Sequence, residues 1–527
     1  MEGSPGLGPF CLHYRIAILL TMRALLLVTT ALVLASSARA QQASPYLPLD
    51  HWTMPYLEHL VRARTIRDPS PLIRPFRRAD AREVLRAADT VNASGAIRSL
   101  VRRLATYFAT DRNTEIWYRT DLMFGGRAAT HARRTAVRDS GNGDLWNRGH
   151  LSGVGVVGPV AFASRLDWDY RLEADPDYQG SISREVAIPN RFNDAYGSVQ
   201  FRLGEVYFGQ MDRNWGPTFV EGVILSPSPY SYDHFAVRFG TRHASVSVLA
   251  TQFDDLPNGA GNNAQRYLVL HNIYLRLPFH LTANIWEGTL FAGENRQFEP
   301  WFLNPFKLAN RTWRDEGGLP NNNLVGGDFE LAIPHWPRAY FSVFIDDFPP
   351  AAGDEEPTSG ALTAGVQGAT HGVAWTAFYT AVANLTYRAT SPEEILTRRG
   401  VGIGRNQSDY DQFTVRLSMM PVAGVLLNPE FTFIRQGEGD FRQPFPPQSD
   451  FPNTPVLHSG VVEKILRIGI DGRVDVPLGP ASVAIAFDAA YHRFTNFGHI
   501  RGATGDRFVG SIQADFIVGW SHLLWEP

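Results

Sequence analysis

The stretch FASRLDWDYRL, residues 162–172, decides the fold because apolar and charged side chains alternate along it. The alternating sets are Leu166, Trp168, Tyr170 and Leu172 against Arg165, Asp167, Asp169 and Arg171. Successive side chains of a β-strand point to opposite faces, so one face of this segment is apolar and the other is charged. The segment is therefore predicted to be a β-strand that separates an apolar surface from a polar one.

The same period of two continues from about Glu115 to the C-terminal end of the chain. It is clear in three further stretches, residues 328–333, 341–346 and 482–491. We count about eighteen such segments of about ten residues, within the even-numbered range of bacterial outer-membrane barrels. A soluble β-sandwich also alternates, so the period by itself does not separate the two folds.

The connections between these segments favour a membrane barrel. Long stretches rich in Pro, Gly, Asn and Asp alternate with short links such as Gly158-Pro159 and Leu277-Pro278; the long ones are 130–144, 175–194, 349–359, 389–408 and 437–455. Outer-membrane barrels have long outer loops and short periplasmic turns, with aromatic residues near both membrane interfaces. Aromatic residues make up 12% of this chain, and many lie toward the ends of the predicted strands. The predicted fold class is thus an all-β transmembrane barrel.

A helical period precedes the barrel between residues 50 and 110. Apolar residues recur there at three- and four-residue spacing, which predicts three short helices; the recurring residues are Leu57, Leu60 and Val61, then Ala81, Val84, Leu85 and Ala88, then Ile97, Leu100, Val101 and Leu104. Prolines between 69 and 75 separate the first two helices, and Ser94 can cap the third. We expect a periplasmic helical segment at 41–112 and the barrel at 113–527.

The N-terminal residues predict export. A basic start at Met22-Arg23, an apolar run and the ending Ala38-Arg39-Ala40 describe a secretory signal peptide cleaved after Ala40, with Met22 rather than Met1 as the initiator. The one cysteine, Cys11, lies ahead of that site, so the mature chain is expected to contain neither a disulfide nor a catalytic thiol. After Ala40 no apolar run approaches the roughly 18 residues of a membrane helix.

The charge of the chain excludes nucleic acid as a partner. The formal net charge is -3 and the pI is about 6.6, so the basic excess of a nucleic-acid-binding protein is absent. Nearly all positive charge is arginine, with Lys307 and Lys464 the only lysines. A GC-rich genome explains this bias; recognition of acidic ligands by guanidinium groups is the alternative. The mean hydropathy of -0.17 fits a barrel, because alternation averages out in such an index.

The sequence contains no motif that predicts an enzyme, a metal site or a cofactor site. No His-x-x-Glu-His spacing, phosphate-binding loop or Gly-x-Ser-x-Gly occurs. Asp346 and Asp347 are neighbours on a predicted strand and point to opposite faces, so turn capping is favoured over catalysis. Asp167 and Asp169 share a face with Arg165, which favours ion pairs. A hydrolase triad assembled across strands remains an alternative, since triads are defined by geometry.

The densest unusual segment is FGQMDRNWGP, residues 208–217, which follows a predicted strand that begins near Glu205. Arg213 and Trp215 offer a planar donor and an aromatic face within three residues, the two features that a saccharide site needs. Asp212 lies beside them and completes the candidate polysaccharide site. The alternative is a packing role, with Arg213 paired inside the barrel to Asp212, Glu205 or another carboxylate.

Together with residues 222–226, this segment resembles the capsule assembly Wzi family. Other similar features are Glu287 with Asn304-Pro305, the stretch 321–324 leading to Gly327-Asp328, and Asp346-Asp347 at the end of a strand. The resemblance extends over most of the mature chain. It departs at the C-terminus, where outer-membrane strands commonly end on an aromatic residue and this chain ends in Trp525-Glu526-Pro527.

The resemblance implies an outer-membrane barrel of about eighteen strands, a periplasmic helical bundle and a lectin-like role in retaining capsular polysaccharide at the cell surface. The expected partners are capsular or surface polysaccharide, outer-membrane lipid and the barrel assembly machinery. A porin or solute channel is the alternative function, because charged faces such as 165–171 would line a lumen. Whether the lumen is open or closed distinguishes the two.

Overall fold

The computed structural model describes residues 43–109, 116–180, 189–307, 321–347, 356–479 and 481–523. The predicted signal peptide, the predicted boundary between residues 112 and 113 and the C-terminal residues 525–527 lie outside these ranges.

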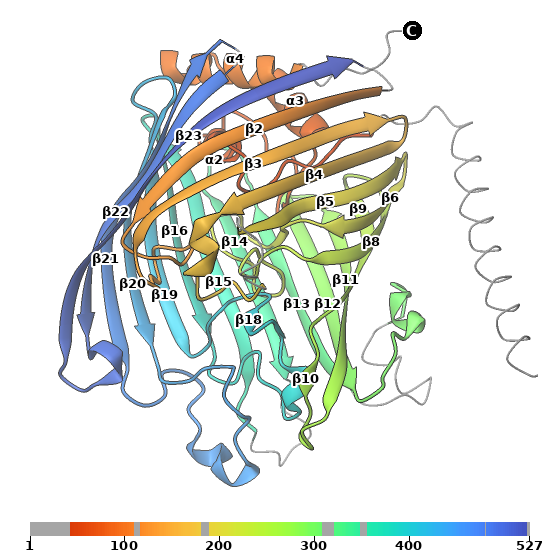
Figure 1. Cartoon of the computed structure of the whole chain (residues 1–527), viewed down its shortest axis with the longest axis vertical. Helices are drawn as coiled ribbons and strands as arrows, with labels where there is room; N and C mark the ends of the chain where they lie inside the picture. The colour runs from red at the N-terminus through yellow and green to blue at the C-terminus, as the bar shows by residue number, and fades with distance from the viewer. Residues whose placement is uncertain are drawn as a thin grey trace, which may run out of the picture.

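The main sheet is a closed antiparallel barrel (Figure 1). It contains 19 strands, of which the two-residue β10 (Leu256–Pro257) pairs only with β11, so 18 form the wall. The ring closes where the first wall strand pairs with the last, Trp117 opposite Leu523. This confirms the predicted fold class and strand number.

The wall strands are β2 (Ile116–Ala129), β3 (Asp144–Val157), β4 (Val160–Asp169), β5 (Asn190–Phe201), β6 (Gly204–Gln210), β8 (Asp233–Gly240), β9 (Ala244–Gln252), β11 (Asn263–Arg276), β12 (Leu281–Gly293), β13 (Asn322–Leu331), β14 (Arg338–Asp347), β15 (Ser359–Thr370), β16 (Val373–Val382), β19 (Tyr410–Ser418), β20 (Val425–Gln436), β21 (Glu463–Leu478), β22 (Ala481–Thr495) and β23 (Thr504–Leu523).

Alternation along the strands gives the wall its two faces. On β23 the outward residues are Phe508, Ile512, Phe516 and Trp520, which are 64%, 55%, 44% and 45% exposed. Val509 and Asp515, of opposite parity, are buried. The outward face is therefore apolar, as lipid requires, and the inward face carries polar groups.

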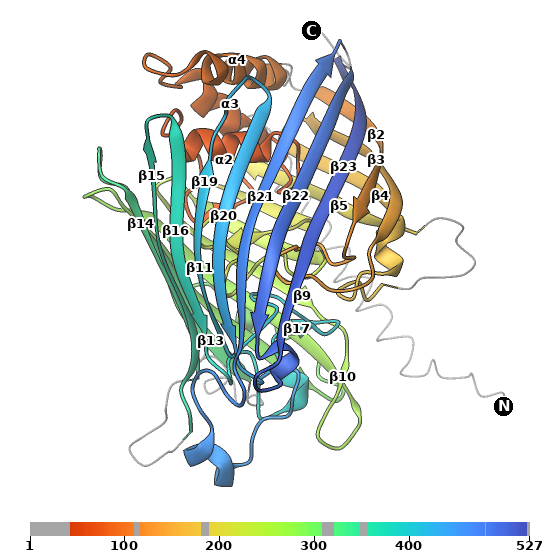
Figure 2. The ribbon, with the colours of Figure 1, turned by 90° about the vertical axis from the view of Figure 1, so that its left-hand side faces the viewer.

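Three helices cover the end of the barrel at which the strand connections are short (Figures 1 and 2). They are α2 (Met54–Arg62), α3 (Arg78–Arg86) and α4 (Gly95–Ala109), as the helical period predicts. Ser94 Oγ accepts a hydrogen bond from the N–H of Ile97 at 3.2 Å, which confirms the predicted cap. The helices pack on barrel residues Met420 and Leu426. Within the described ranges, no helix is both long enough and apolar enough to cross a membrane.

Two long connections lie inside the barrel. Residues 211–232 and 383–409 contribute Val223, Ile224 and Ile403 to one apolar cluster with inward-facing wall residues such as Leu268 and Phe344. The first connection contains β7 (Asn214–Trp215), which pairs with β1 (Ile73–Arg74) of the N-terminal segment. The second contains the hairpin β17 (Thr397–Arg398) and β18 (Val401–Gly402). The predicted outer loop 389–408 thus folds inward.

The stretch 162–172 differs from its prediction at one end. The strand ends at Asp169, and η1 (Tyr170–Glu173) is a 3-10 turn whose Arg171 N–H donates to Asp169 Oδ1 at 2.9 Å. Arg171 NH1 also donates to Asp175 Oδ2 at 2.5 Å. Arg171 is buried on the side that the alternation predicts, but Leu172, predicted for the apolar outward face, is 2% exposed because the 3-10 turn interrupts the alternation. The remaining short elements are η2 (Pro300–Leu303), η3 (Pro392–Glu394), η4 (Gln448–Asn453) and η5 (Phe497–His499).

Candidate functional site

Trp215 lies in the lumen and contacts protein rather than solvent. It is 4% exposed and belongs to the central apolar cluster. Its N–H donates to Leu225 O at 2.9 Å, and its β-bridge partner is Ile73. The next residue, Gly216, has a φ of 125° and lies close to the Asp328 carboxylate, so a side chain there would be strained. This part of the candidate site therefore joins the N-terminal segment to the lumen segment.

Arg213 packs among aromatic rings. Its Nε donates to His234 Nε2 at 2.7 Å, and its guanidinium lies 4.7 Å from the ring centroid of Tyr207 and 5.7 Å from that of Tyr46. Glu205, one suggested partner of Arg213, forms its ion pair with Arg77 instead, at 2.8 Å. Arg213 thus ties the lumen segment to the wall through cation–π contacts.

Asp212 is the one carboxylate among the three candidate residues, and its charge is affected by two nearby arginines. Burial raises the pKa of the Asp212 carboxyl to about 6, against the opposing effect of Arg134 and Arg191. Sequence reasoning grouped Asp212 with Arg213 and Trp215, but their environments differ. Contact of any of the three with polysaccharide stays a prediction.

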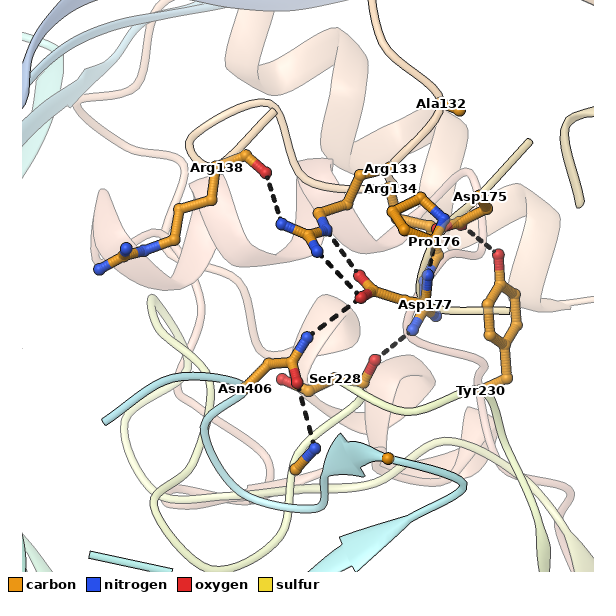
Figure 3. Close-up of polar contacts among 12 residues, drawn as sticks. Ala132, Arg133, Arg134, Arg138, Asp175, Pro176, Asp177, Ser228, Tyr230 and Asn406 are labelled. Carbon is orange, nitrogen blue, oxygen red and sulfur yellow. Dashed lines mark hydrogen bonds and ion pairs between the residues drawn. The ribbon is translucent and has the colours of Figure 1, made fainter. Parts of the chain in front are cut away.

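Asp177 joins three connections at the loop end of the barrel (Figure 3). Its Oδ2 lies 2.9 Å from Arg133 Nε, and its Oδ1 accepts from Asn406 Nδ2 at 3.2 Å. Arg133 belongs to the β2–β3 connection, Asp177 to the β4–β5 connection and Asn406 to the β16–β19 connection. One carboxylate therefore fixes three loops to each other.

Tyr230 forms a second junction beside Asp177 (Figure 3). Its hydroxyl donates to Asp175 Oδ2 at 2.5 Å. Arg134 lies 4.1 Å and Arg191 4.6 Å from the centroid of its ring. Arg134 also donates to Ser228 O at 2.5 Å, so the loop 226–232 is held by charge-assisted bonds and by ring stacking.

Arg266, which sequence reasoning missed, holds the inward connection 383–409. It is fully buried on β11, and its guanidinium donates to the backbone oxygens of Glu393 at 2.6 Å, Thr397 at 3.1 Å and Asp254 at 3.2 Å, and to that of Ile395. No local pattern marks this arginine, because its acceptors are backbone atoms far away in the sequence.

Tyr387 fastens the two lumen connections to each other. Its hydroxyl donates to Val223 O at 2.6 Å, and its N–H donates to Asp346 Oδ2 at 2.5 Å. Asp346 therefore anchors a distant loop. Glu287 Oε1 lies 2.9 Å from His271 Nδ1, and His271 Nε2 lies 2.6 Å from the backbone oxygen of Phe302.

The described residues supply little for metal or acid–base chemistry. In these ranges no group of three or more His, Cys, Asp or Glu side chains is placed to hold a metal ion. Asp167 lies 3.0 Å from Arg165 Nε, and Asp169 lies 3.4 Å from Arg171 NH2. These contacts are the ion pairs that the alternation predicts.

A cavity of about 220 Å³ opens beside the Tyr230 junction. Arg191, Arg398 and Arg399 line it together with Tyr178 and Tyr230. A second cavity, of about 330 Å³, lies between the helices and the wall and is lined by Trp52, Tyr107 and charged side chains of both signs. The first cavity combines cationic and aromatic groups at the loop end.

No protein-family model matches the chain, and no curated protein sequence matches it. Among solved structures the barrel is similar to Wzi of Escherichia coli, an outer-membrane protein involved in group 1 capsule assembly and described as a carbohydrate-binding β-barrel. The TM-score is 0.59 at 14% identity, over 88% of this chain and 96% of that one. This likeness shows that the chain has the fold of an outer-membrane β-barrel.

Two other solved barrels are similar over a smaller share of this chain. OprD of Pseudomonas aeruginosa has a TM-score of 0.43 at 12% identity, over 78% of this chain and 96% of that one. OccAB4 of Acinetobacter baumannii has a TM-score of 0.44 at 10% identity, over 78% and 100%. At these scores neither structure bears on function.

Proposed function

We propose that this outer-membrane barrel, which shares the fold of Wzi, binds surface polysaccharide at its loop end and takes part in capsule assembly or surface attachment without conducting solutes. The observation that carries the proposal is the inward folding of residues 211–232 and 383–409, which pack with the inner wall in one apolar cluster. A channel needs a continuous aqueous path. These connections place buried apolar side chains across the lumen instead.

The contacts that hold the connections support a permanent closure. Arg266 donates to backbone oxygens of 393–397, and Tyr387 joins the two connections through Val223 O. Breaking such bonds would leave buried polar groups without partners, which costs about 1–3 kcal/mol for each group. The loop end is therefore expected to act as a rigid surface.

The groups on that surface suit carbohydrate. Arg507 lies 5.4 Å from the ring centroid of Phe497, which is 38% exposed. Aromatic faces pack against sugar rings, and guanidinium forks bind hydroxyl or carboxylate oxygens in pairs. The carbohydrate binding described for Wzi agrees with this use of the same fold.

The proposed assignment of Asp212, Arg213 and Trp215 to polysaccharide contact has its own test. Arg213→Gln removes the guanidinium and keeps a hydrogen-bond donor. If these residues bind the polysaccharide, the variant loses binding without losing stability. If they serve packing, stability falls and the residual folded fraction binds normally.

Two measurements test the proposed function. Purified protein in planar bilayers is expected to show no steady single-channel conductance, whereas regular conducting steps would replace the proposal by a solute channel. Deletion of the gene in its host is expected to release capsule or surface polysaccharide into the medium, and complementation is expected to restore attachment. A normally attached polysaccharide layer in the deletion strain would refute the role in attachment.

A further inference from the structure

The cavity of about 220 Å³ lies at the outer ends of β5 and β6. Arg191 and Phe192 reach it from the first residues of β5, and Gln210 reaches it from the last residue of β6. The opposite ends of these two strands are joined by the short turn 202–203, on the side of the helical cap. The cavity is therefore on the outer side of the membrane.

Strand length sets the height of the cavity relative to the membrane. β6 has 7 residues, whereas β22 has 15 and β23 has 20. Figure 2 shows the long strands β22 and β23 side by side in the wall. At about 3.3 Å per residue and a tilt of about 35–45°, a strand of the length of β6 rises about 16–19 Å, less than the apolar band of about 25 Å. The outer end of β6 thus lies no higher than the boundary between lipid tails and head groups.

The side chains around the cavity agree with that height. Phe192 lines the cavity and is 48% exposed, and Phe208 on the neighbouring strand is 65% exposed. Both lie on the apolar outward face of the wall. One edge of the cavity, at Phe192, therefore lies on the lipid-facing surface of the wall.

Three guanidinium groups meet in the cavity without a carboxylate partner among the described residues. Arg191 donates to Asn193 Oδ1 at 2.7 Å and to Ser231 Oγ at 2.9 Å. Arg399 donates to Gln179 O at 3.1 Å. Arg398 lies 5.1 Å from the ring centroid of Tyr232.

The carboxylates nearby are engaged elsewhere. Asp177, which also lines the cavity, pairs with Arg133, and Asp254 Oδ1 accepts from the backbone N–H of Arg399. Asp212 acts electrostatically on Arg191 but not on Arg398. Burial and the neighbouring charge of Arg399 lower the pKa of the Arg398 guanidinium. The cluster therefore carries positive charge that an anion would neutralise.

Two buried arginines of the barrel wall are paired with carboxylates. Arg165 contacts Asp50 and Asp194, and Arg467 contacts Glu430 and Asp488. Within the described ranges, no such ion pair is formed by Arg398, which is partly buried, or by Arg399, which is exposed. Their guanidinium groups are therefore accessible to an anion from outside the barrel.

We propose that this cavity binds the anionic sugar head group of an outer-leaflet glycolipid, with its phosphate or carboxylate held by Arg398 and Arg399 and its ring against Tyr178. The proposal rests on the transmembrane barrel and not on polysaccharide attachment. An acidic sugar of a soluble polysaccharide has the same chemistry and would come from the medium. The height of the cavity and the exposed Phe192 favour the membrane-anchored source.

The test uses full-length protein in nanodiscs of zwitterionic phospholipid, titrated with fluorescent phosphorylated lipopolysaccharide. Arg398→Gln/Arg399→Gln removes two charges from the cavity. Arg493→Gln/Arg501→Gln removes two charges from exposed residues near the outer end of β22 and in the loop that follows it, outside the cavity, and is the matched control. Thermal unfolding of each variant verifies that the barrel is folded.

We expect the cavity variant to bind at least about tenfold more weakly, since two charge-assisted hydrogen bonds are lost, and the control to bind within about twofold of the wild type. Dephosphorylated glycolipid is expected to bind weakly to all proteins. Equal losses in both variants, or no loss in the cavity variant, would overturn the proposal. A soluble carboxylated oligosaccharide that binds as tightly and displaces the glycolipid would assign the cavity to polysaccharide instead.

Discussion

Asp177 Oδ2 lies 2.9 Å from Arg133 Nε, so the second long connection of the barrel wall is tied to the first. The same carboxylate accepts from Asn406 Nδ2 of a connection that follows more than two hundred residues later. Both Arg133 and Asp177 are largely buried, at 19% and 12% side-chain exposure. The loop end of the barrel therefore has one polar centre on which three loops depend.

Replacement of Asp177 by Ala is expected to loosen all three loops at once. Loss of the charge-assisted bonds is expected to cost about 1.5–3 kcal/mol of stability. Hydrogen exchange followed by mass spectrometry is expected to show faster exchange in 131–139 and 398–406. Asp450→Ala, at an exposed loop position, is the control and is expected to leave exchange in these segments unchanged.

Arg266→Met is expected to open the lumen. The substitution keeps much of the side-chain length and removes the guanidinium donors to the backbone oxygens of Glu393, Ile395 and Thr397. Each buried oxygen left without a partner costs about 1–3 kcal/mol. The connection 383–409 then leaves the lumen, and single-channel conductance appears in planar bilayers. An Arg266→Met protein that stays as silent as the control Arg242→Gln would show that this arginine is not needed for closure.

Tyr56→Phe is expected to weaken the attachment of the helical cap. The Tyr56 hydroxyl donates to Asp475 Oδ2 at 2.6 Å and to Gly424 O at 2.9 Å. Its removal is expected to cost about 1–3 kcal/mol, measured as a lower melting temperature in detergent. The strands themselves are expected to keep their circular dichroism signal, because only the contact between cap and wall is lost.

Asp212 is expected to make stability depend on pH. Burial raises the pKa of its carboxyl to about 6 in the folded protein, above the ordinary value of about 3.9. The stabilisation by the neutral form is complete below the ordinary value and is lost as pH rises through about 6. Relative to Asp212→Asn, the wild type is expected to lose up to about 3 kcal/mol between pH 4 and pH 8. Parallel pH profiles of the two proteins would contradict this.

Trp215→Ala is expected to destabilise the barrel by about 3–5 kcal/mol, as for other large-to-small substitutions of buried aromatic residues. Trp215 is 4% exposed within the central cluster. Chemical unfolding in lipid vesicles measures the loss. Trp336→Ala, at a residue that is 68% exposed in a short connection, is expected to change stability by less than about 0.5 kcal/mol.

Parts of the candidate site could be predicted and parts could not. The segment 208–217 stands out in the sequence by composition, and the structure places residues 208–210 in the wall strand β6 and residues 211–217 inside the lumen. The sequence cannot show that Trp215 faces Ile73, because the bridge joins residues that lie far apart in the chain. Arg266 and Arg398 have no distinguishing local pattern, so neither the lumen anchor nor the cationic cavity could be predicted.

The sequence by itself determined the wall and the cap. A period of two fixes which face of each strand meets lipid, and a period of 3.6 fixes the three helices, because both follow from local backbone geometry. Only the tertiary structure decided that long connections fold inward and which arginines of the described ranges lack an ion pair. These depend on contacts between residues separated by 127 positions, as for Arg266 and Glu393, or by 229, as for Asn406 and Asp177. Closure of the ring brings such residues together, and no local pattern encodes it.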